Sequence, residues 1–141
     1  MEEALAPHLG AIHGVDISEE MLLRARRRCA GLRNVALSAC TGRDLDAFAA
    51  ESFDLVLAVD SFPYLVQSGH ALVDAHVAGA SRVLRAGSDL VVLNYSYRDD
   101  PSADREDVRV LARKHGFEVL VCGATPFAIW SAPAFRLRRR A

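Results

Sequence analysis

Two carboxylates, Asp16 and Asp60, stand directly after runs of apolar residues. The first run covers residues 11–15. The second, Phe53–Val59, is nearly continuous in apolar residues, which is typical of a strand covered on both faces. An ionised carboxylate is an acceptor-only group, so at a rigid strand end it can hold two hydroxyl groups of a ligand. A carboxylate can also orient a reactant and take up its proton. We therefore predict ligand binding at Asp16 and a part in chemistry at Asp60.

Aromatic and polar side chains follow Asp60 and also end a later apolar run that begins at Asp89. They are Ser61, Phe62 and Tyr64 after Asp60, and Asn94, Tyr95 and Tyr97 at the end of the later run. In open α/β sheets, ligands bind outside the carboxyl ends of the strands, so we expect these residues on one rim. A tyrosine ring beside a cationic ligand is worth roughly 0.5–2 kcal/mol. The alternative is that Asp60 caps its loop while Phe62 and Tyr64 pack in the core.

The strands and helices that would position these residues alternate along the chain. Apolar runs predict strands, apolar residues at helical spacing predict helices, and glycines such as Gly31 and Gly87 predict helix ends. The predicted strands cover residues 11–16, 35–39, 53–59, 89–95, 117–122 and 134–137; the predicted helices cover 2–10, 18–30, 69–85 and 104–115, with a helical turn at 46–50 and a loop at 61–64. This alternation predicts a parallel sheet with helices on both faces. The last two strands have no helix between them, which predicts a hairpin and one antiparallel strand.

Length and composition indicate one globular domain. The chain has 141 residues, of which 51% are hydrophobic and 25% charged, and its formal net charge is -1. So small a net charge produces no long-range field for nucleic acid or an anionic membrane, and we expect neither as a partner. Cys29, Cys40 and Cys122 are far apart and odd in number, which favours a reducing, cytoplasmic compartment. The scattered histidines have no metal-binding spacing, so we expect no metal site.

Four spaced motifs give the chain a family resemblance. They are Gly14–Leu22, Phe53–Val56, Arg82–Leu90 and His115–Phe117. In this order and spacing they resemble the class I S-adenosylmethionine-dependent methyltransferases of the small-molecule type, over nearly the whole chain. The resemblance implies a Rossmann-like, doubly wound α/β fold whose mostly parallel sheet ends in an antiparallel hairpin. It also implies S-adenosyl-L-methionine as the cofactor and a small molecule as the methyl acceptor.

The same resemblance implies the positions that bind the cofactor and act in catalysis. The cofactor-binding positions are Asp16, Ile17, Met21, Thr41, Gly42, Arg43, Asp60 and Ser61, and the catalytic ones are Asp60 and Tyr64. Asp16 would hold both ribose hydroxyls, with Ile17 and Met21 beside the adenine. Packing at the start of the helix is an equally good interpretation of Met21. Asp44 is an alternative to Thr41 as an acceptor for the adenine, and it also suits a helix cap.

One part of the family pattern is missing from the sequence. In that family, a first strand and a glycine-rich loop of the type E/DxGxGxG hold the methionine part of the cofactor, because glycines let the backbone approach closely. Nothing before Glu2 supplies this loop, and Gly10 and Gly14 do not have its spacing. The first strand is central in the fold, so we expect ladder groups to be left unpaired between the second and fourth strands. We interpret the chain as an N-terminally truncated methyltransferase-like domain that binds the cofactor poorly by itself.

Methyl transfer to a small molecule has two competitors. The first is a non-catalytic or partner-dependent remnant of the same fold, which the missing glycine loop favours. The second is a nicotinamide-dependent oxidoreductase, which also ends its second strand in an acid. Such enzymes usually need a further pair such as Tyr-x-x-x-Lys, and the only lysine, Lys114, is not at that spacing from Tyr97.

Overall fold

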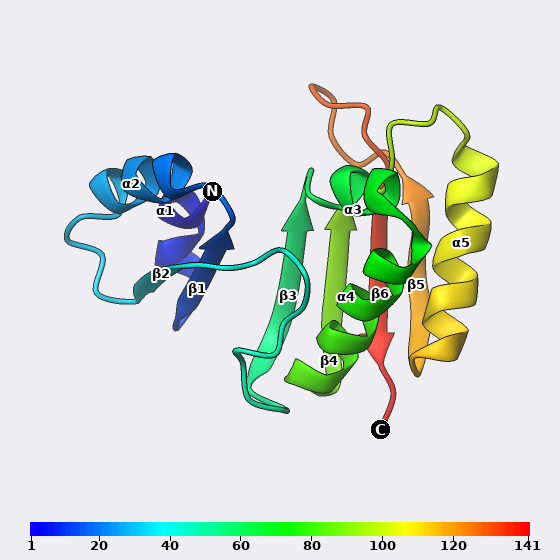
Figure 1. Cartoon of the computed structure of the whole chain (residues 1–141), viewed down its shortest axis with the longest axis horizontal. Helices are drawn as coiled ribbons and strands as arrows, with labels where there is room; N and C mark the ends of the chain where they lie inside the picture. Colours follow the sequence, from blue (N-terminus) through cyan, green and yellow to red (C-terminus); the bar gives the residue numbers. More distant parts are fainter. The chain divides into compact units, whose positions relative to one another are not determined.

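The computed structural model describes residues 1–141, which form two compact units, Met1–Arg43 and Asp44–Ala141 (Figure 1). The strands form two separate sheets. A parallel pair, β1–β2, belongs to the first unit, and a four-stranded sheet of order β3-β4-β6-β5 belongs to the second. β1 and β3, which correspond to the second and fourth strands of the family pattern, belong to different sheets, and the unpaired ladder groups expected between them stay a prediction. The single domain stays a prediction.

The first unit consists of short elements connected by tight turns. They are α1 (Glu2–Leu5), a 3-10 helix η1 (Ala6–His8), β1 (Ile12–Asp16), α2 (Glu19–Arg28) and β2 (Val35–Ala39). Ser18 caps α2, since its hydroxyl accepts a hydrogen bond from the Met21 amide. The Asn34 side-chain amide donates to the carbonyls of Ala6 and Leu9, at 2.8 and 2.9 Å, and so ties the first turns to the start of β2.

The second unit carries the longer elements and the larger sheet. They are β3 (Phe53–Val59), α3 (Phe62–Ser68), α4 (His70–Val83), β4 (Leu84–Leu93), α5 (Pro101–Lys114), β5 (Phe117–Ala124) and β6 (Ala134–Arg139). Strands β3 and β4 are parallel, while β6 lies between β4 and β5 and is antiparallel to both. The predicted Rossmann-like α/β fold with an antiparallel C-terminal pair is therefore confirmed.

Several predicted boundaries differ from the structure, three of them for local reasons. Residues 62–64 begin α3, with Ser61 as its N-cap, instead of forming a loop, because Pro63 in the first helical turn has the backbone angle that a helix start needs. The helix predicted over 69–85 ends at Val83, and Gly87, with φ +79°, lies inside β4 where the register with β3 shifts. Helix α5 starts at Pro101 rather than Asp104, since the Asp100 carboxylate caps it. The helical turn predicted at 46–50 is an irregular turn.

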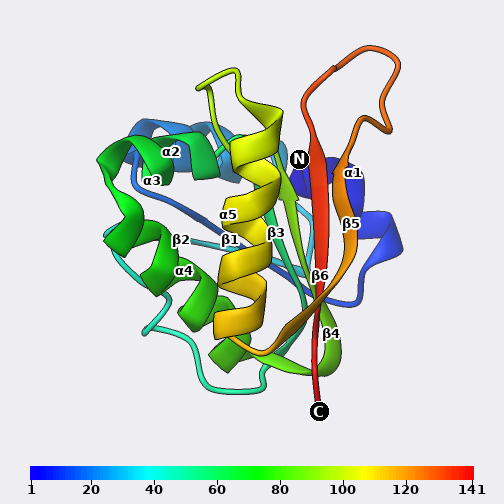
Figure 2. The same ribbon diagram turned by 90° about the vertical axis from the view of Figure 1, so that its right-hand side faces the viewer.

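One hydrophobic core holds the second unit together. The buried helix residues are Phe62 from α3, Val73, Val77 and Ala80 from α4, and Val108, Leu111 and Ala112 from α5. The buried residues of the sheet and its ends are Leu84, Leu90, Val92, Tyr95, Phe117, Phe135 and Leu137. Figures 1 and 2 show α4 and α5 on the same side of the four-stranded sheet. These helices therefore support the strands whose carboxyl ends carry Asp60 and Asn94.

A charged cluster joins two strands of the sheet. Asp89 in β4 faces Arg138 and Arg136 in β6. Its Oδ1 accepts a hydrogen bond from Arg138 Nε at 2.9 Å, and its Oδ2 accepts one from Arg136 Nε at 2.8 Å. Hydrogen bonds from Arg138, and then from Arg136, hold the pKa of the Asp89 carboxyl below its ordinary value of 3.8. The cluster therefore stabilises the folded chain above about pH 4 and loses this effect as the pH falls through the lowered pKa.

Replacing Asp89 by asparagine should lower the free energy of unfolding by about 1 kcal/mol at neutral pH, because both arginines are partly exposed to water. The difference from the unmodified chain should shrink as the pH falls through the lowered pKa of Asp89, because the native carboxyl is then also protonated. A series of urea denaturation curves from neutral to strongly acidic pH measures this. Asp54→Asn is the control, since its ion pair with Arg85 is exposed. A deficit for Asp89→Asn that is the same at every pH would contradict the assignment.

Candidate functional site

In the first unit, Asp16 is a carboxylate held at the end of a strand. Its Oδ1 accepts a hydrogen bond from the Ser18 amide at 2.8 Å, while Oδ2 makes no contact of this kind within the chain. The Asp16 carbonyl accepts from the Cys40 amide at 3.0 Å, which joins the ends of β1 and β2. The carboxylate is therefore fixed in direction and keeps one oxygen for a ligand.

Apolar side chains that a core would bury are exposed beside Asp16. Ile17 is 70% exposed and Met21 is 51% exposed, whereas Leu22 on the same helix is 3% exposed. Packing at the helix start thus does not account for Met21. Gly42, with φ +70°, lies against Ile17, because a Cβ there would come within 2.9 Å of Ile17 Cγ2. The Arg43 amide donates to the Thr41 hydroxyl at 3.3 Å and fixes the turn that follows β2.

In the second unit, Asp60 and Asn94 follow two neighbouring parallel strands. Asn94 Nδ2 donates to Asp60 Oδ1 at 2.7 Å. Both residues adopt left-handed backbone angles, with φ +55° and +67°, which cost non-glycine residues about 1 kcal/mol or more each. Backbone hydrogen bonds hold both conformations, from the Asp60 amide to Leu93 and from the Asn94 amide to Pro133, each at 2.9 Å. The two side chains therefore form one polar pair at the rim of the sheet.

Two exposed tyrosines complete this rim. The rings of Tyr64 and Tyr97 meet edge to face, with centroids 6.0 Å apart, and are 60% and 50% exposed. Hydrogen bonding of the Tyr97 hydroxyl to Asp60, more than to Tyr64, raises the pKa of Tyr97 to about 12. The hydroxyl is therefore a neutral donor at physiological pH.

The remaining predicted rim residues lie elsewhere. Phe62 is buried beside Tyr95, with ring centroids 5.9 Å apart, so the packing interpretation of Phe62 is the correct one. Tyr95 is a core residue rather than a rim residue, and burial raises the pKa of its hydroxyl well above the ordinary value. Ser61 is exposed at the start of α3. Asp44 accepts a hydrogen bond from the Asp46 amide at 3.1 Å and caps no helix.

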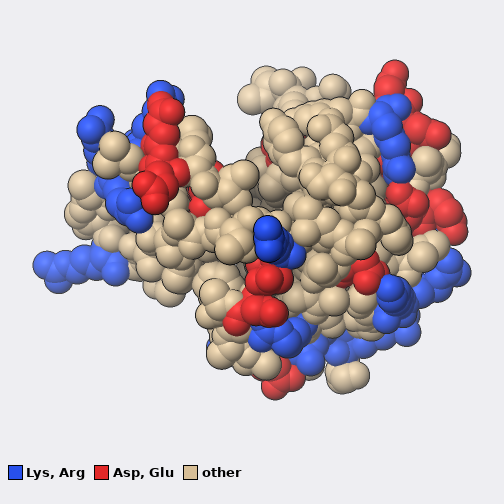
Figure 3. Space-filling model, viewed as in Figure 1, with Lys and Arg blue, Asp and Glu red and all other residues tan.

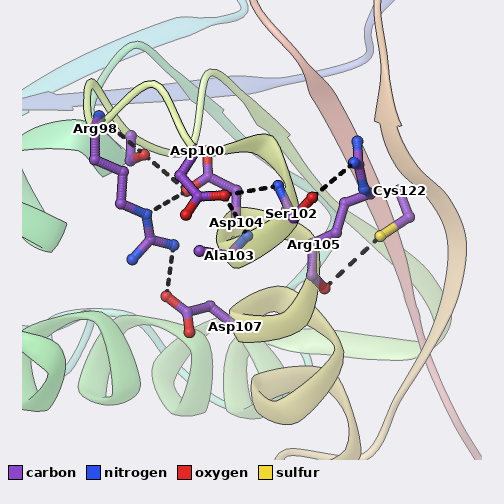
Figure 4. A network of polar contacts seen from close by, with 9 residues as sticks. Arg98, Asp100, Ser102, Ala103, Asp104, Arg105, Asp107 and Cys122 are labelled. Atoms are coloured by element: carbon purple, nitrogen blue, oxygen red, sulfur yellow. Dashed lines mark hydrogen bonds and ion pairs between the residues drawn. The ribbon is translucent and has the colours of Figure 1, made fainter.

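A polar network that the sequence pattern did not reveal holds the loop carrying Tyr97 (Figure 4). Asp104 is 4% exposed, and its Oδ1 accepts from the Ser96 hydroxyl and from Arg98 Nε, each at 2.7 Å. Arg98 also donates to Asp107 at 2.7 Å, and its guanidinium lies 5.8 Å from the centre of the Tyr95 ring. Asp100 directly before Pro101 is a sequence signal for a helix start. That signal could have placed Asp104 and Asp107 in the first turns of α5, beside the loop that they hold.

The described residues include no group of three or more histidine, cysteine, aspartate or glutamate side chains arranged to share a metal ion. The three cysteines are free. None of the helices is both long enough and apolar enough to cross a bilayer.

Residues 1–87, more than half of the chain, match the family described as "Methyltransferase domain". The chain belongs to this methyltransferase family. It is of the class I, S-adenosylmethionine-dependent type, and S-adenosyl-L-methionine is the cofactor. The matched stretch contains Asp16, Thr41, Asp60 and Tyr64, and it favours methyl transfer over hydride transfer.

Among curated proteins, this methyltransferase is 35% identical over 98 residues to "Phosphatidylethanolamine N-methyltransferase" of Cereibacter sphaeroides. The alignment covers 67% of this chain and 45% of that protein. The chain therefore spans less than half the length of the curated relative that it matches.

Solved structures of low sequence identity share the methyltransferase fold. A SAM-dependent methyltransferase from Methanosarcina mazei superposes with a TM-score of 0.72 at 15% identity, over 99% of this chain and 87% of that chain. The N-methyltransferase NodS from Bradyrhizobium japonicum has a TM-score of 0.69 at 18% identity, over 99% and 79%. A putative methyltransferase in complex with the Haloferax volcanii Trm112 methyltransferase activator has a TM-score of 0.75 at 17% identity, over 98% and 76%. These likenesses establish the fold alone.

Proposed function

We propose that this domain acts in the transfer of a methyl group from S-adenosyl-L-methionine to a small-molecule acceptor. The observation that carries the proposal is the Asp16 carboxylate, which is fixed at a strand end with one oxygen uncommitted. In a fold of this family, a carboxylate in that position suits the paired hydroxyls of a ribose.

The surface around Asp16 fits the adenosine part of the cofactor. Asp16 Oδ2 accepts from ribose hydroxyls in this proposal, while the exposed Ile17 and Met21 lie against the faces of the adenine. The turn of Thr41, Gly42 and Arg43 offers backbone groups and one hydroxyl to the adenine edge. Gly42 suits this place, because a larger residue would displace Ile17.

The rim of the second unit fits the reacting groups. When bound, S-adenosyl-L-methionine supplies an electrophilic methyl group on its sulfur. In this proposal, Asp60 orients the acceptor and takes its proton. Asn94 holds the Asp60 carboxylate in place, and Tyr64 offers its exposed ring to the acceptor. Such catalysis consists largely of positioning.

A small acceptor in a reducing cytoplasm is the setting that we propose. Two similar proteins support nitrogen as the methylated atom, since one is named a phosphatidylethanolamine N-methyltransferase and the other is the N-methyltransferase NodS. The three free cysteines suit a reducing compartment. The near-zero net charge supports a small molecule rather than nucleic acid as the acceptor.

The test has two readouts on the full 141-residue chain. S-adenosylhomocysteine, titrated to millimolar concentration, should shift backbone NMR signals of residues 16–21 and 40–43. Tritiated methyl groups should pass from S-adenosylmethionine to a member of a panel of small amines, alcohols and thiols. Shifts that avoid both segments, together with no transfer above the rate without protein, would overturn the proposal.

A further inference from the structure

Asp60 is an exposed carboxylate whose partners in the chain are all neutral. It accepts a hydrogen bond from the Asn94 amide, and its interaction with the Tyr97 hydroxyl raises the pKa of Tyr97 to about 12. None of the ion pairs of the chain includes Asp60. By contrast, Asp54 in β3 and Asp89 in the neighbouring β4 both pair with arginines. The full negative charge of Asp60 therefore has no cation beside it within the chain.

Two exposed tyrosine rings, Tyr64 and Tyr97, lie on the same rim as this carboxylate. Tyr64 and Tyr97 meet edge to face, so one ring presents a face to the other's edge and both keep about half or more of their surface exposed. The face of a tyrosine ring carries negative electrostatic potential and attracts cations. In Figure 3, the surface over α3 and over the loop between β5 and β6 is mostly uncharged in the view shown. Few neighbouring charges on that surface would compete with a ligand.

We propose that Asp60, Tyr64 and Tyr97 bind the ammonium group of an amine, so that the methyl acceptor is an amine. This inference rests on the proposed function. An ammonium group gains both a charge-assisted hydrogen bond to the carboxylate and attraction to the rings. An alcohol can donate a hydrogen bond to the carboxylate but gains neither the charge–charge attraction nor the attraction of a cation to the rings, and an anionic acceptor is repelled by the carboxylate. The amine is carried by a soluble molecule or by a lipid headgroup, which offer the same chemistry.

The carboxylate also provides the proton acceptor that an ammonium group needs. A protonated amine has no lone pair with which to attack carbon. Transfer of one proton from nitrogen to an Asp60 oxygen breaks an N–H bond and forms an O–H bond, leaving a neutral amine and a neutral carboxyl. The neutral Tyr97 hydroxyl and the Asn94 amide remain to hold the carboxyl group.

The experiment compares n-butylammonium with 1-butanol, using NMR signals of labelled tyrosine rings in the full chain. The chain has three tyrosines, and buried Tyr95 reports on folding in every variant. Butylammonium should shift Tyr64 and Tyr97 saturably and leave Tyr95 unmoved, with affinity about tenfold above that of butanol. Asp60→Asn, which keeps an oxygen for Asn94, should weaken ammonium binding about tenfold. Asp99→Asn removes an exposed carboxylate from the neighbouring loop and should change it less than about twofold.

Equal binding of butanol and butylammonium would overturn the inference, as would equal effects of Asp60→Asn and Asp99→Asn.

Two further arms distinguish the sources of the amine, namely soluble ethanolamine and phosphatidylcholine vesicles with or without phosphatidylethanolamine. Binding in either arm supports the inference and names the source, and binding in neither overturns it. Titration with S-adenosylhomocysteine in the same samples separates the two proposals. If the preference for ammonium is lost while the shifts around Asp16 are intact, this inference fails and the proposed function stands. If the shifts around Asp16 are absent while the preference for ammonium is intact, the proposed function fails and only the ammonium site remains.

Discussion

Replacing Asp16 by asparagine should weaken the binding of S-adenosylhomocysteine by a factor of about 30 or more, which corresponds to about 2 kcal/mol. An asparagine keeps one oxygen for the Ser18 amide and so preserves the turn between β1 and α2. It cannot accept two hydroxyl groups with the strength of a carboxylate, because its other terminal group is a donor. The loss should therefore appear in ligand affinity rather than in folding.

NMR shift titration of the full chain measures the affinity and remains usable when binding is weak. Glu19→Gln is the matched control, since it removes an exposed carboxylate from the first turn of α2 beside the site. It should change the affinity less than about twofold. Equal losses in the two variants would mean that negative charge in general, and not a contact made by Asp16, attracts the ligand.

Replacing Asp104 by alanine should lower the free energy of unfolding by about 3 kcal/mol, the largest effect that we expect from a single polar side chain here. Asp104 is buried, and its removal leaves the Ser96 hydroxyl and the Arg98 Nε group without their shared acceptor. The loop from Asn94 to Asp100 should also open more often, since these contacts hold it to α5. Tyr97 lies in that loop, so the rim beside Asp60 should lose its order.

Urea denaturation and amide hydrogen exchange measure the two parts of this prediction. Asp107→Ala is the control, because Asp107 pairs with the same arginine from a more exposed position. It should cost about 0.5 kcal/mol and leave exchange of the Ser96 and Tyr97 amides nearly unchanged. A cost for Asp104→Ala as small as that for Asp107→Ala would show that the buried carboxylate contributes little.

Sequence patterns located the strands better than the helix starts. Strands β2 and β3 have the predicted bounds, because each is a short apolar run with polar residues at both sides. Helix α3 was missed because its seven residues are too few for a helical period to stand out from a loop containing Pro63. The sequence pattern predicts a helix end at Gly87, whereas its positive φ belongs to the irregular part of β4. Such positions depend on which strand lies alongside, and the local pattern does not contain that information.

The sequence by itself determined the family, the parallel strands, the antiparallel end of the sheet and the two strand-end carboxylates. Only the tertiary structure decided which side chains meet. Asp60 pairs with Asn94 because the parallel register places Val59 opposite Leu93, so that the next residue of each strand lies at the same edge. Tyr95 and Tyr97 stand two residues apart, yet one is buried and the other is exposed. Long-range packing makes that choice, since composition and spacing treat the two tyrosines alike.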